Sequence, residues 1–321
     1  MMKPKGQVAS IDCEKIHKLS ERLTRDGRGL RIMEICGTHT MAIARSGLRS
    51  LLPAALRLVS GPGCPVCVTD QSYVDRAVHL AGLDGVAVAT YGDMVRVPGR
   101  GGSLGEARSA GGRVEVVASA EAAVDLAARR PETEVVFLGV GFETTAPGTA
   151  LAVKRARDEG VGNFSVLTAH KLVLPVMRAL LAGGDVRIDG FLCPGHVSVI
   201  LGRRAYEEIV RDFGRPCVVA GFDAGQIVLG LEAILEQLVR GAPRASNVYP
   251  SVSDDGNPVA LRLLDEVFEP AGALWRAIGP VPASGLSLGP AFAAFDAERR
   301  FDLPEAESYE LPGCRCGDVI L

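Results

Sequence analysis

The sequence predicts an α/β protein with two successive Rossmann-like domains, whose parallel sheets would face each other across a cleft, and a small irregular C-terminal segment that contains cysteines. Short apolar segments recur along the chain, and most are followed by a loop and then by a segment with helical periodicity. Such alternation is typical of parallel sheets. Polar and cysteine-containing motifs come directly after the apolar segments, where the strands of open parallel sheets bind ligands.

The first domain is predicted over residues 1–130 and the second over residues 131–241. An amphipathic helix within residues 13–30 precedes the strands of the first domain, which are expected at 31–35, 56–60, 86–90 and 114–118. After Pro131 the pattern begins again, with strands expected at 134–140, 164–169, 188–193 and 217–221.

The last part of the chain, residues 242–321, is less regular. A helix is predicted over residues 259–269, whereas the stretch from Trp275 to Leu286 is expected to be irregular and to dock on the sheets. The pattern leaves open whether the chain crosses back to the first domain after residue 241.

Composition excludes several classes of protein. With 321 residues the chain is long enough for two domains of about 150 residues each. Its net charge of −3 argues against nucleic-acid binding, which requires a basic surface. No apolar run reaches the roughly 18 residues of a membrane span, and the first residues lack the apolar core of a secretory signal. We therefore expect a cytoplasmic protein with neither a nucleic-acid partner nor a membrane partner.

The chain has eight cysteines, several of them in local motifs. In a cytosolic chain of this length, such motifs indicate metal or redox chemistry rather than structural disulfides. Cys64 and Cys67 form a Cys-x-x-Cys pair, whose sulfurs can form a disulfide or share a soft metal. Two packed thiols in a strand-end loop are the structural alternative. Cys314 and Cys316 are also close in sequence, but two thiolates do not complete a four-cysteine iron–sulfur site.

Cys36 lies in the motif CGTHT, between a predicted strand and a predicted helix. The dipole of the helix lowers the pKa of a thiol at this place and favours its exposure. His39 could pair with the thiolate or bind a metal. The alternative is a buried cysteine beside a threonine N-cap, and the local pattern does not decide between the two.

Three further motifs end predicted strands of the second domain. GFETTAP lacks both the Walker lysine and the GxGxxG spacing, so it is a weak nucleotide signal. Its Glu143 offers a carboxylate. The local pattern nevertheless favours a structural role for this motif, in which Thr145 is the N-cap of the next helix. His170 and His196 follow two other strands at equivalent places, which modestly favours a functional role over core packing.

These motifs together resemble the HypD family of NiFe-hydrogenase maturation factors. The resemblance covers residues from about 30 to 321 and rests on MEICGTHT, GPGCPVCVT, GFETTAP, CPGHVSVILG, WRAIGPVPASGL and CRCGDVI, in this order. It implies two α/β domains and a C-terminal region that holds a 4Fe–4S cluster. It also implies a scaffold on which the Fe(CN)2CO unit of the hydrogenase is assembled, with a HypC-like chaperone and a HypE-like cyanide donor.

The resemblance assigns a role to each motif. It implies iron binding by Cys36 and His39, a redox-active pair of Cys64 and Cys67, roles in the cleft for Glu143 and His196, and cluster binding by Cys314 and Cys316. The family continues past the last motif with further cysteines, whereas this chain stops at Leu321. We therefore expect either a fragment or a member that does not build the usual cluster.

Three functions remain open at this point. The first is the iron scaffold, which requires Cys36. The second is a thiol–disulfide oxidoreductase that uses Cys64 and Cys67, which leaves CGTHT and GFETTAP unexplained. The third is a small-molecule enzyme such as a carbamoyl- or phosphotransferase, which ranks last because no phosphate loop is present. The sequence does not decide whether the protein catalyses a step or only holds the iron.

Overall fold

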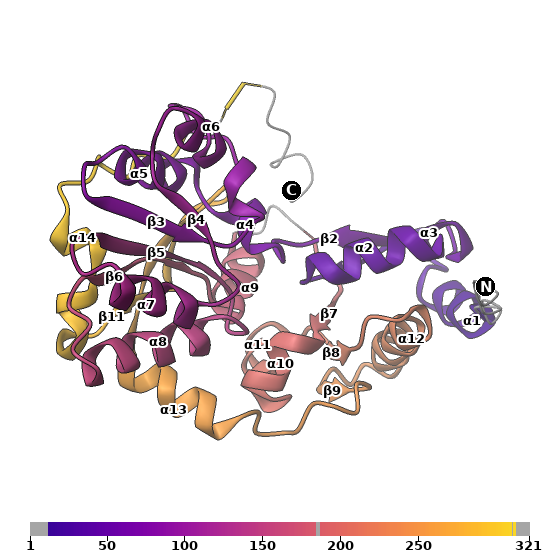
Figure 1. Cartoon of the computed structure of the whole chain (residues 1–321). Helices are drawn as coiled ribbons and strands as arrows, with labels where there is room; N and C mark the ends of the chain where they lie inside the picture. The colour runs from indigo at the N-terminus through magenta and orange to yellow at the C-terminus, as the bar shows by residue number, and fades with distance from the viewer. Residues whose placement is uncertain (1–11, 184–186, 310, 313–321) are drawn as a thin grey trace, which may run out of the picture. The chain divides into compact units, whose positions relative to one another are not determined.

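The computed structural model describes residues 12–183, 187–309 and 311–312. These residues form two parallel sheets covered by helices and one antiparallel hairpin (Figure 1). The predicted α/β class with two Rossmann-like sheets is confirmed. The chain divides into two compact units, each made of two separate stretches of sequence. We call them unit 1 (Met1–Gly63 and Gly183–Gly256) and unit 2 (Cys64–Ala182 and Asn257–Leu321).

These units do not follow the predicted boundaries at residues 130 and 241. The first two predicted strands share one sheet with the last two, and the four strands between them in sequence form the other sheet. The prediction of successive domains was wrong because apolar periodicity locates strands without saying which of them pair. Strands that are consecutive in sequence are neighbours in only about two-thirds of cases. The chain changes units after Gly256 and not after residue 241, and it then enters unit 2.

Unit 1 contains a five-stranded parallel sheet. Its strand order is β2-β1-β7-β8-β9, with β1 (Leu30–Glu34), β2 (Leu56–Ser60), β7 (Gly190–Pro194), β8 (Cys217–Ala220) and β9 (Ala245–Asn247). Its helical segments are α1 (Glu14–Leu23), α2 (Gly37–Ser46), α3 (Leu48–Leu51), α10 (Gly195–Leu201), η2 (Arg204–Tyr206), α11 (Glu207–Phe213) and α12 (Ala224–Arg240). The connections leave β1 and β7 in opposite directions, so the topological switch point lies between these two strands.

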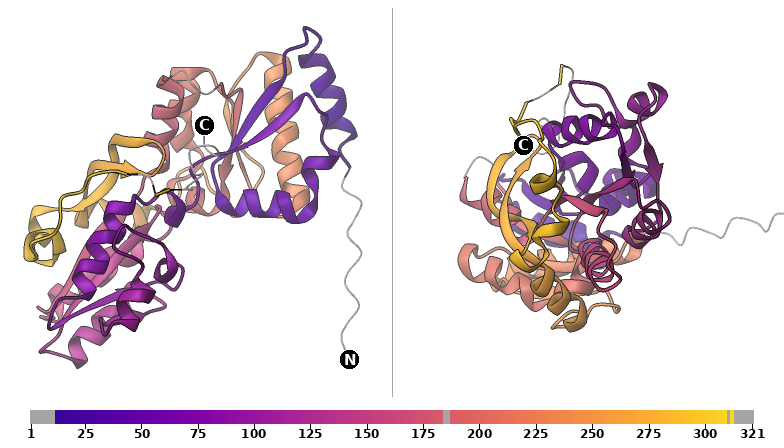
Figure 2. Two further views of the ribbon diagram at one scale, coloured as in Figure 1. Left: turned by 90° about the horizontal axis from the view of Figure 1, so that it is seen from above. Right: turned by 60° about the vertical axis from the view of Figure 1, so that its left-hand side comes forward.

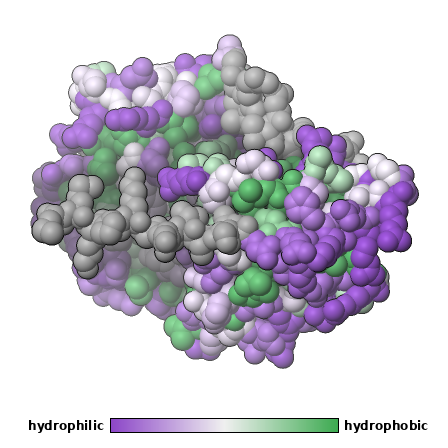
Figure 3. All heavy atoms as spheres, turned by 90° about the vertical axis from the view of Figure 1, so that its right-hand side faces the viewer, coloured by the Kyte–Doolittle hydropathy of each residue, from purple (hydrophilic) through white to green (hydrophobic). Residues whose placement is uncertain are grey.

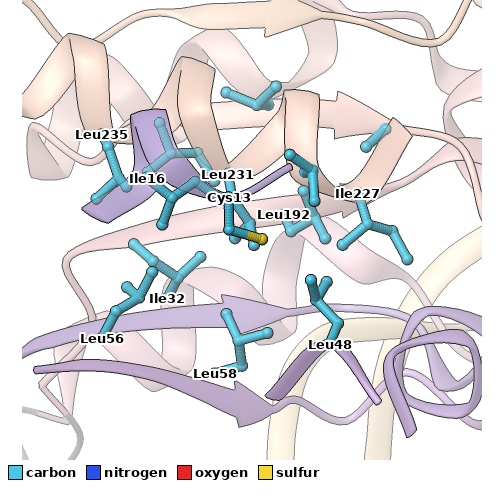
Figure 4. Close-up of a cluster of buried hydrophobic side chains, with 14 of the residues drawn as sticks. Cys13, Ile16, Ile32, Leu48, Leu56, Leu58, Leu192, Ile227, Leu231 and Leu235 are labelled. Atoms are coloured by element: carbon cyan, nitrogen blue, oxygen red, sulfur yellow. The ribbon is translucent and has the colours of Figure 1, made fainter. Parts of the chain in front are cut away.

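The core of unit 1 lies between its sheet and the helices α1, α2 and α12. Figure 4 shows Ile16 of α1 and Leu231 of α12 above the strand residues Ile32 and Leu58. Ile16, Ile32 and Leu231 are fully buried, and each such side chain contributes about 1.5–3 kcal/mol through apolar burial. Cys13 also belongs to this cluster.

Unit 2 contains a four-stranded parallel sheet of order β4-β3-β5-β6. Its strands are β3 (Val86–Thr90), β4 (Val114–Val116), β5 (Glu134–Gly141) and β6 (Phe164–His170). Its helical segments are α4 (Pro65–Val68), α5 (Gln71–Ala81), η1 (Met94–Arg96), α6 (Leu104–Ser109), α7 (Ala120–Arg129), α8 (Ala146–Asp158), α9 (Val173–Ala182), α13 (Pro258–Val267), η3 (Pro290–Phe295) and α14 (Ala297–Arg300). Figure 1 shows α5 and α6 on one face of this sheet and α7 and α8 on the other. The switch point lies between β3 and β5.

An antiparallel hairpin replaces the predicted irregular stretch in unit 2. It pairs β10 (Phe268–Trp275) with β11 (Gly279–Leu288), coloured orange to yellow in Figure 2. The hairpin meets the end of β6 through a bridge between Lys171 and Gly285. The prediction missed these strands because both contain prolines, which are confined to edge strands or bulges within sheets. The helix predicted to residue 269 ends at Val267 because Pro270 disfavours helical backbone at the preceding residue.

One face of the molecule is drawn with its hydropathy in Figure 3. Figure 3 shows hydrophilic residues over much of the visible face, with hydrophobic residues in smaller groups between them. Among the helices of the described ranges, none combines the length and the apolar character that crossing a membrane would require.

Candidate functional site

The carboxyl edge of the unit 1 sheet gathers several of the predicted motifs. CGTHT follows β1 and CPGHVS overlaps the end of β7, so the two motifs flank the switch point. Residues 61–63 of GPGCPVC follow the neighbouring strand β2. Ligands of open α/β sheets bind at this place, where diverging connections leave a crevice. The edge is therefore the candidate site of unit 1.

Cys36 is half-buried and occupies the N-cap position of α2. Its side chain makes no capping hydrogen bond, so the helix does not use the sulfur. The backbone of Gly63 lies directly against it: a Cβ atom added to Gly63 would be 2.4 Å from both N and Cα of Cys36. Gly37 N–H also donates to Gly63 O at 3.1 Å. The alternative of a buried cysteine beside a threonine N-cap was wrong, since Cys36 itself holds the cap position.

His39 is fully buried on α2, three residues after Cys36. Its Nε2–H donates to Gly221 O at 2.9 Å, and its Nδ1 has no hydrogen-bond partner within the described residues. The predicted pairing of His39 with the Cys36 thiolate is therefore not made. Burial lowers the pKa of His39 to about 4, so its ring is neutral at pH 7. A neutral ring with a free Nδ1 lone pair is the form of histidine that binds metals.

An aromatic residue that the sequence analysis missed joins the two histidine motifs. Phe222 follows β8, and its ring centroid lies 4.8 Å from that of His39 and 4.3 Å from that of the exposed His196. Tyr249 packs against the other side of the cluster at 6.2 Å from Phe222. The only available signal was the place of Phe222 directly after an apolar strand, which does not distinguish a site residue from a core residue.

In unit 2, Cys64 precedes the short helix α4 and Cys67 lies within it. Cys64 is half-buried at the N-cap, Cys67 is exposed, and neither forms a disulfide. Cys67 N–H donates to Cys64 Sγ at 3.3 Å. Hydrogen bonding from the Cys67 thiol is the largest cause that lowers the pKa of Cys64 to about 6, although burial and the charge of Asp93 oppose it. Such a dithiol has the partly exposed, low-pKa sulfur of redox-active pairs.

The reactivity of Cys64 should therefore follow an unusual pH profile. The rate of its alkylation by iodoacetamide, measured on its peptide by mass spectrometry, is expected to rise to about pH 7 and then to level off, because the thiolate is then fully formed. Cys67→Ala should move the midpoint from about 6 toward the ordinary value of 9. If Cys67→Ala had the same pH profile as the wild type, the Cys67 thiol would not be what stabilises the Cys64 thiolate.

Glu143 lies directly after β5, beside the switch point of the unit 2 sheet, and is buried. Its Oε1 accepts a hydrogen bond from Val173 N–H at 2.9 Å, whereas its Oε2 has no partner within the described residues. Burial raises the pKa of Glu143 to about 7. Thr145 takes the predicted N-cap position of α8, but the predicted capping bond was wrong: its Oγ1 donates to Phe142 O at 3.2 Å. A carboxyl group with this pKa can exchange a proton near neutral pH.

The two strand-end histidines are not at equivalent places in one domain, as predicted, because His170 belongs to unit 2 and His196 to unit 1. His170 is buried, with Nε2 at 3.0 Å from Thr149 Oγ1 and a pKa lowered to about 3 by burial. This is the environment of a core histidine. The pairing of strands from distant parts of the sequence separated the two residues.

The structure thus distributes the predicted site residues over the two units. Cys36, His39 and His196 lie at the carboxyl edge of unit 1, and Cys64, Cys67 and Glu143 belong to unit 2. Within the described ranges, no three side chains of His, Cys, Asp or Glu are grouped so that they could hold a metal ion. Cys314 and Cys316 lie outside the described residues, so the cluster prediction stays a prediction.

Comparison with known proteins agrees with this set of motifs. The HypD family model, described as the hydrogenase formation hypA family, matches residues 9–321. The hydrogenase maturation factors HypD of Rhodobacter capsulatus and Escherichia coli are 42% and 41% identical to the chain, each over 91% of this chain and 79% of the relative. A hydrogenase maturation factor HypD of Rhizobium leguminosarum bv. viciae is 40% identical over 98% of this chain and 83% of its own length.

Proposed function

The chain belongs to the HypD family of hydrogenase maturation factors, and from this premise we propose that it is a scaffold for assembly of the Fe(CN)2CO unit of NiFe hydrogenase. The iron is cargo in this proposal and leaves with the hydrogenase. A HypC-like chaperone would share the iron, and a HypE-like protein would deliver the cyanide.

The observation that carries the proposal is the position of Cys36. Its sulfur is half-buried at the switch point of unit 1 and is not used by the helix that it begins. A thiolate is a soft ligand that suits low-spin iron with cyanide and carbon monoxide. The neutral ring of His39, fixed by its bond to Gly221 O, supports the same edge and keeps an unpaired Nδ1.

The dithiol of unit 2 would supply electrons. Oxidation of the Cys64 thiolate and the Cys67 thiol to a disulfide forms one S–S bond and releases two electrons and one proton. The lowered pKa of Cys64 means that one sulfur is already a thiolate at pH 7. Glu143, with a pKa of about 7, is a candidate acceptor for a proton in the same unit. Cys314 and Cys316 would supply two of the four thiolate ligands of a C-terminal 4Fe–4S cluster, which would contribute electron-transfer chemistry.

Infrared spectroscopy tests the scaffold directly. The chain, co-purified without oxygen with its HypC-like partner from cells that make hydrogenase, is expected to show cyanide and carbonyl stretching bands. Cys36→Ala should remove the bands because the thiolate ligand is lost. Cys13→Ala is the matched control, since Cys13 is a buried core thiol of the same unit and should leave the bands unchanged. Bands of equal intensity in Cys36→Ala would refute the proposal.

The second candidate function is thiol–disulfide exchange without iron, which the low pKa of Cys64 favours. It predicts turnover of a protein or small-molecule dithiol by the isolated chain. Cys64→Ser would abolish this activity and Cys36→Ala would preserve it. Turnover together with absent infrared bands would replace the scaffold by the oxidoreductase.

A further inference from the structure

A pocket in unit 2 is not used by the proposed assembly chemistry. It has a volume of about 210 Å³ and lies between the carboxyl end of β6, the first turns of α5 and the β10–β11 hairpin. The pocket is smaller than the roughly 300 Å³ from which drug-sized ligand sites begin. Its hairpin wall includes the small residues Ala271, Gly272 and Gly285 as well as Leu274 and Leu286. Such a pocket suits a small polar ligand.

Lys171 is the buried cation of this pocket. Only 4% of its surface is exposed, although its ammonium group carries three N–H donors. One donor is used, in a bond from Nζ to Leu274 O at 2.8 Å. Within the described residues no carboxylate forms an ion pair with Lys171, and buried lysines are rare unless paired. The charge of Asp70 attracts the ammonium but does not form an ion pair with it.

The other charges of the pocket are already engaged. Asp70 Oδ1 accepts from both the N–H and the hydroxyl of Ser72, and its Oδ2 accepts from the Ser308 hydroxyl at 2.6 Å. Arg76 and Glu298 form an ion pair with each other at 2.6 Å. These contacts keep both carboxylates out of an ion pair with Lys171, so the remaining N–H donors of its ammonium are available to a ligand.

We propose that this pocket binds a small oxyanion, of the size of phosphate or a short carboxylate, and that the Lys171 ammonium is its counter-ion. The first turn of α5 lines the same pocket through Ser72 and Tyr73, and Asp70 caps the N-terminus of this helix. The inference depends on the cavity and on a buried lysine that forms no ion pair within the described residues, and is independent of iron binding. Thr69, another lining residue, follows Cys67 by two positions, so the anion would bind beside the dithiol segment.

The chain carries a natural reporter for this site. Its single tryptophan, Trp275, is buried, and Lys171 Nζ lies 5.6 Å from the centre of its ring. An anion that binds the ammonium changes the electric field at the indole, and the emission spectrum responds. Inorganic phosphate and acetate, titrated separately into the full chain at constant ionic strength with chloride as the reference, should each be tested for a saturable change.

The expected result is a saturable change with at least one of the two anions. Binding should weaken by about tenfold or more in Lys171→Met, because a charged hydrogen-bond partner is lost. Lys154→Met is the matched control. Lys154 lies on α8 and is paired with Glu266 on α13, so this substitution should leave the affinity unchanged. A response to phosphate alone identifies a tetrahedral ligand, and a response to acetate alone identifies a carboxylate.

If the tryptophan emission does not change, equilibrium dialysis with radiolabelled phosphate and labelled acetate measures anion binding directly. It also covers the case in which Lys171→Met fails to fold, because the wild-type chain is sufficient for this measurement. No saturable uptake of either anion by the wild-type chain overturns the proposal. Equal affinity in wild type and folded Lys171→Met overturns it as well, because the anion would then bind elsewhere.

Discussion

Gly63→Ala is expected to destabilise unit 1 by about 3 kcal/mol, at the upper end of the usual cost of overpacking. The added Cβ would lie 2.4 Å from N and Cα of Cys36 and 2.7 Å from the carbonyl carbon of Ile35. All three are backbone atoms, which do not yield as the end of a flexible side chain does. The clash would also move Cys36 away from its place at the N-cap of α2, so iron loading should fall with stability.

Urea unfolding followed by circular dichroism measures this effect. Gly148→Ala is the matched control, because a Cβ at Gly148 meets no atom within 4 Å and the residue lies in helix α8. There alanine should leave stability equal or raise it by about 0.5–1 kcal/mol through its higher helix propensity. If Gly63→Ala and Gly148→Ala had the same stability, the close approach of Gly63 to Cys36 would be disproved.

Lys171→Met is expected to raise the free energy of unfolding by about 2 kcal/mol at pH 7, in buffer without oxyanions. Burial lowers the pKa of Lys171 from 10.5 to about 8, which corresponds to a cost of about 3 kcal/mol for the charged form. The substitution removes this cost but leaves the carbonyl of Leu274 without its donor, which offsets about 1 kcal/mol. Asp70 attracts the ammonium but does not pair with it, so it reduces the burial cost only in part.

The same pKa shift predicts the direction of the pH dependence. Between about pH 8 and pH 10.5 the unfolded chain keeps the proton of Lys171 while the folded chain loses it, so this residue makes stability rise with pH. The advantage of Lys171→Met should therefore be full below pH 8 and shrink toward pH 10.5. The difference between the unfolding free energies of variant and wild type at pH 7 and pH 10 measures it. The exposed-face variant Lys154→Met should show no such trend, and a Lys171→Met protein less stable than wild type at pH 7 would contradict the prediction.

Much of the local structure followed from the sequence. The predicted strands at 56–60 and 86–90 coincide with β2 and β3 to the residue, and the other predicted strands differ by at most a few residues at their ends. Short apolar runs between polar loops determine such strands locally. The short edge strand β9 (Ala245–Asn247) was not predicted, because three residues leave no detectable apolar pattern.

The motifs of the candidate site were also readable in the sequence, and their order identified the family. The protonation and hydrogen bonding of their side chains were not readable in the sequence. His39 is a neutral ring bound to Gly221, and Glu143 keeps one oxygen without a partner, because each is buried by segments distant in sequence. Nothing in the sequence singles out Lys171 beside His170, yet burial makes it the more unusual of the two residues.

The sequence by itself thus determined where strands and helices lie and which residue types follow them, since both depend on neighbours within a few positions. Only the tertiary structure decided which strands pair. It joined β1 to β7 across more than a hundred intervening residues and so divided GPGCPVC between the two units after Gly63. Strand pairing depends on burying apolar faces against partners at any distance along the chain, and periodicity carries no record of that choice.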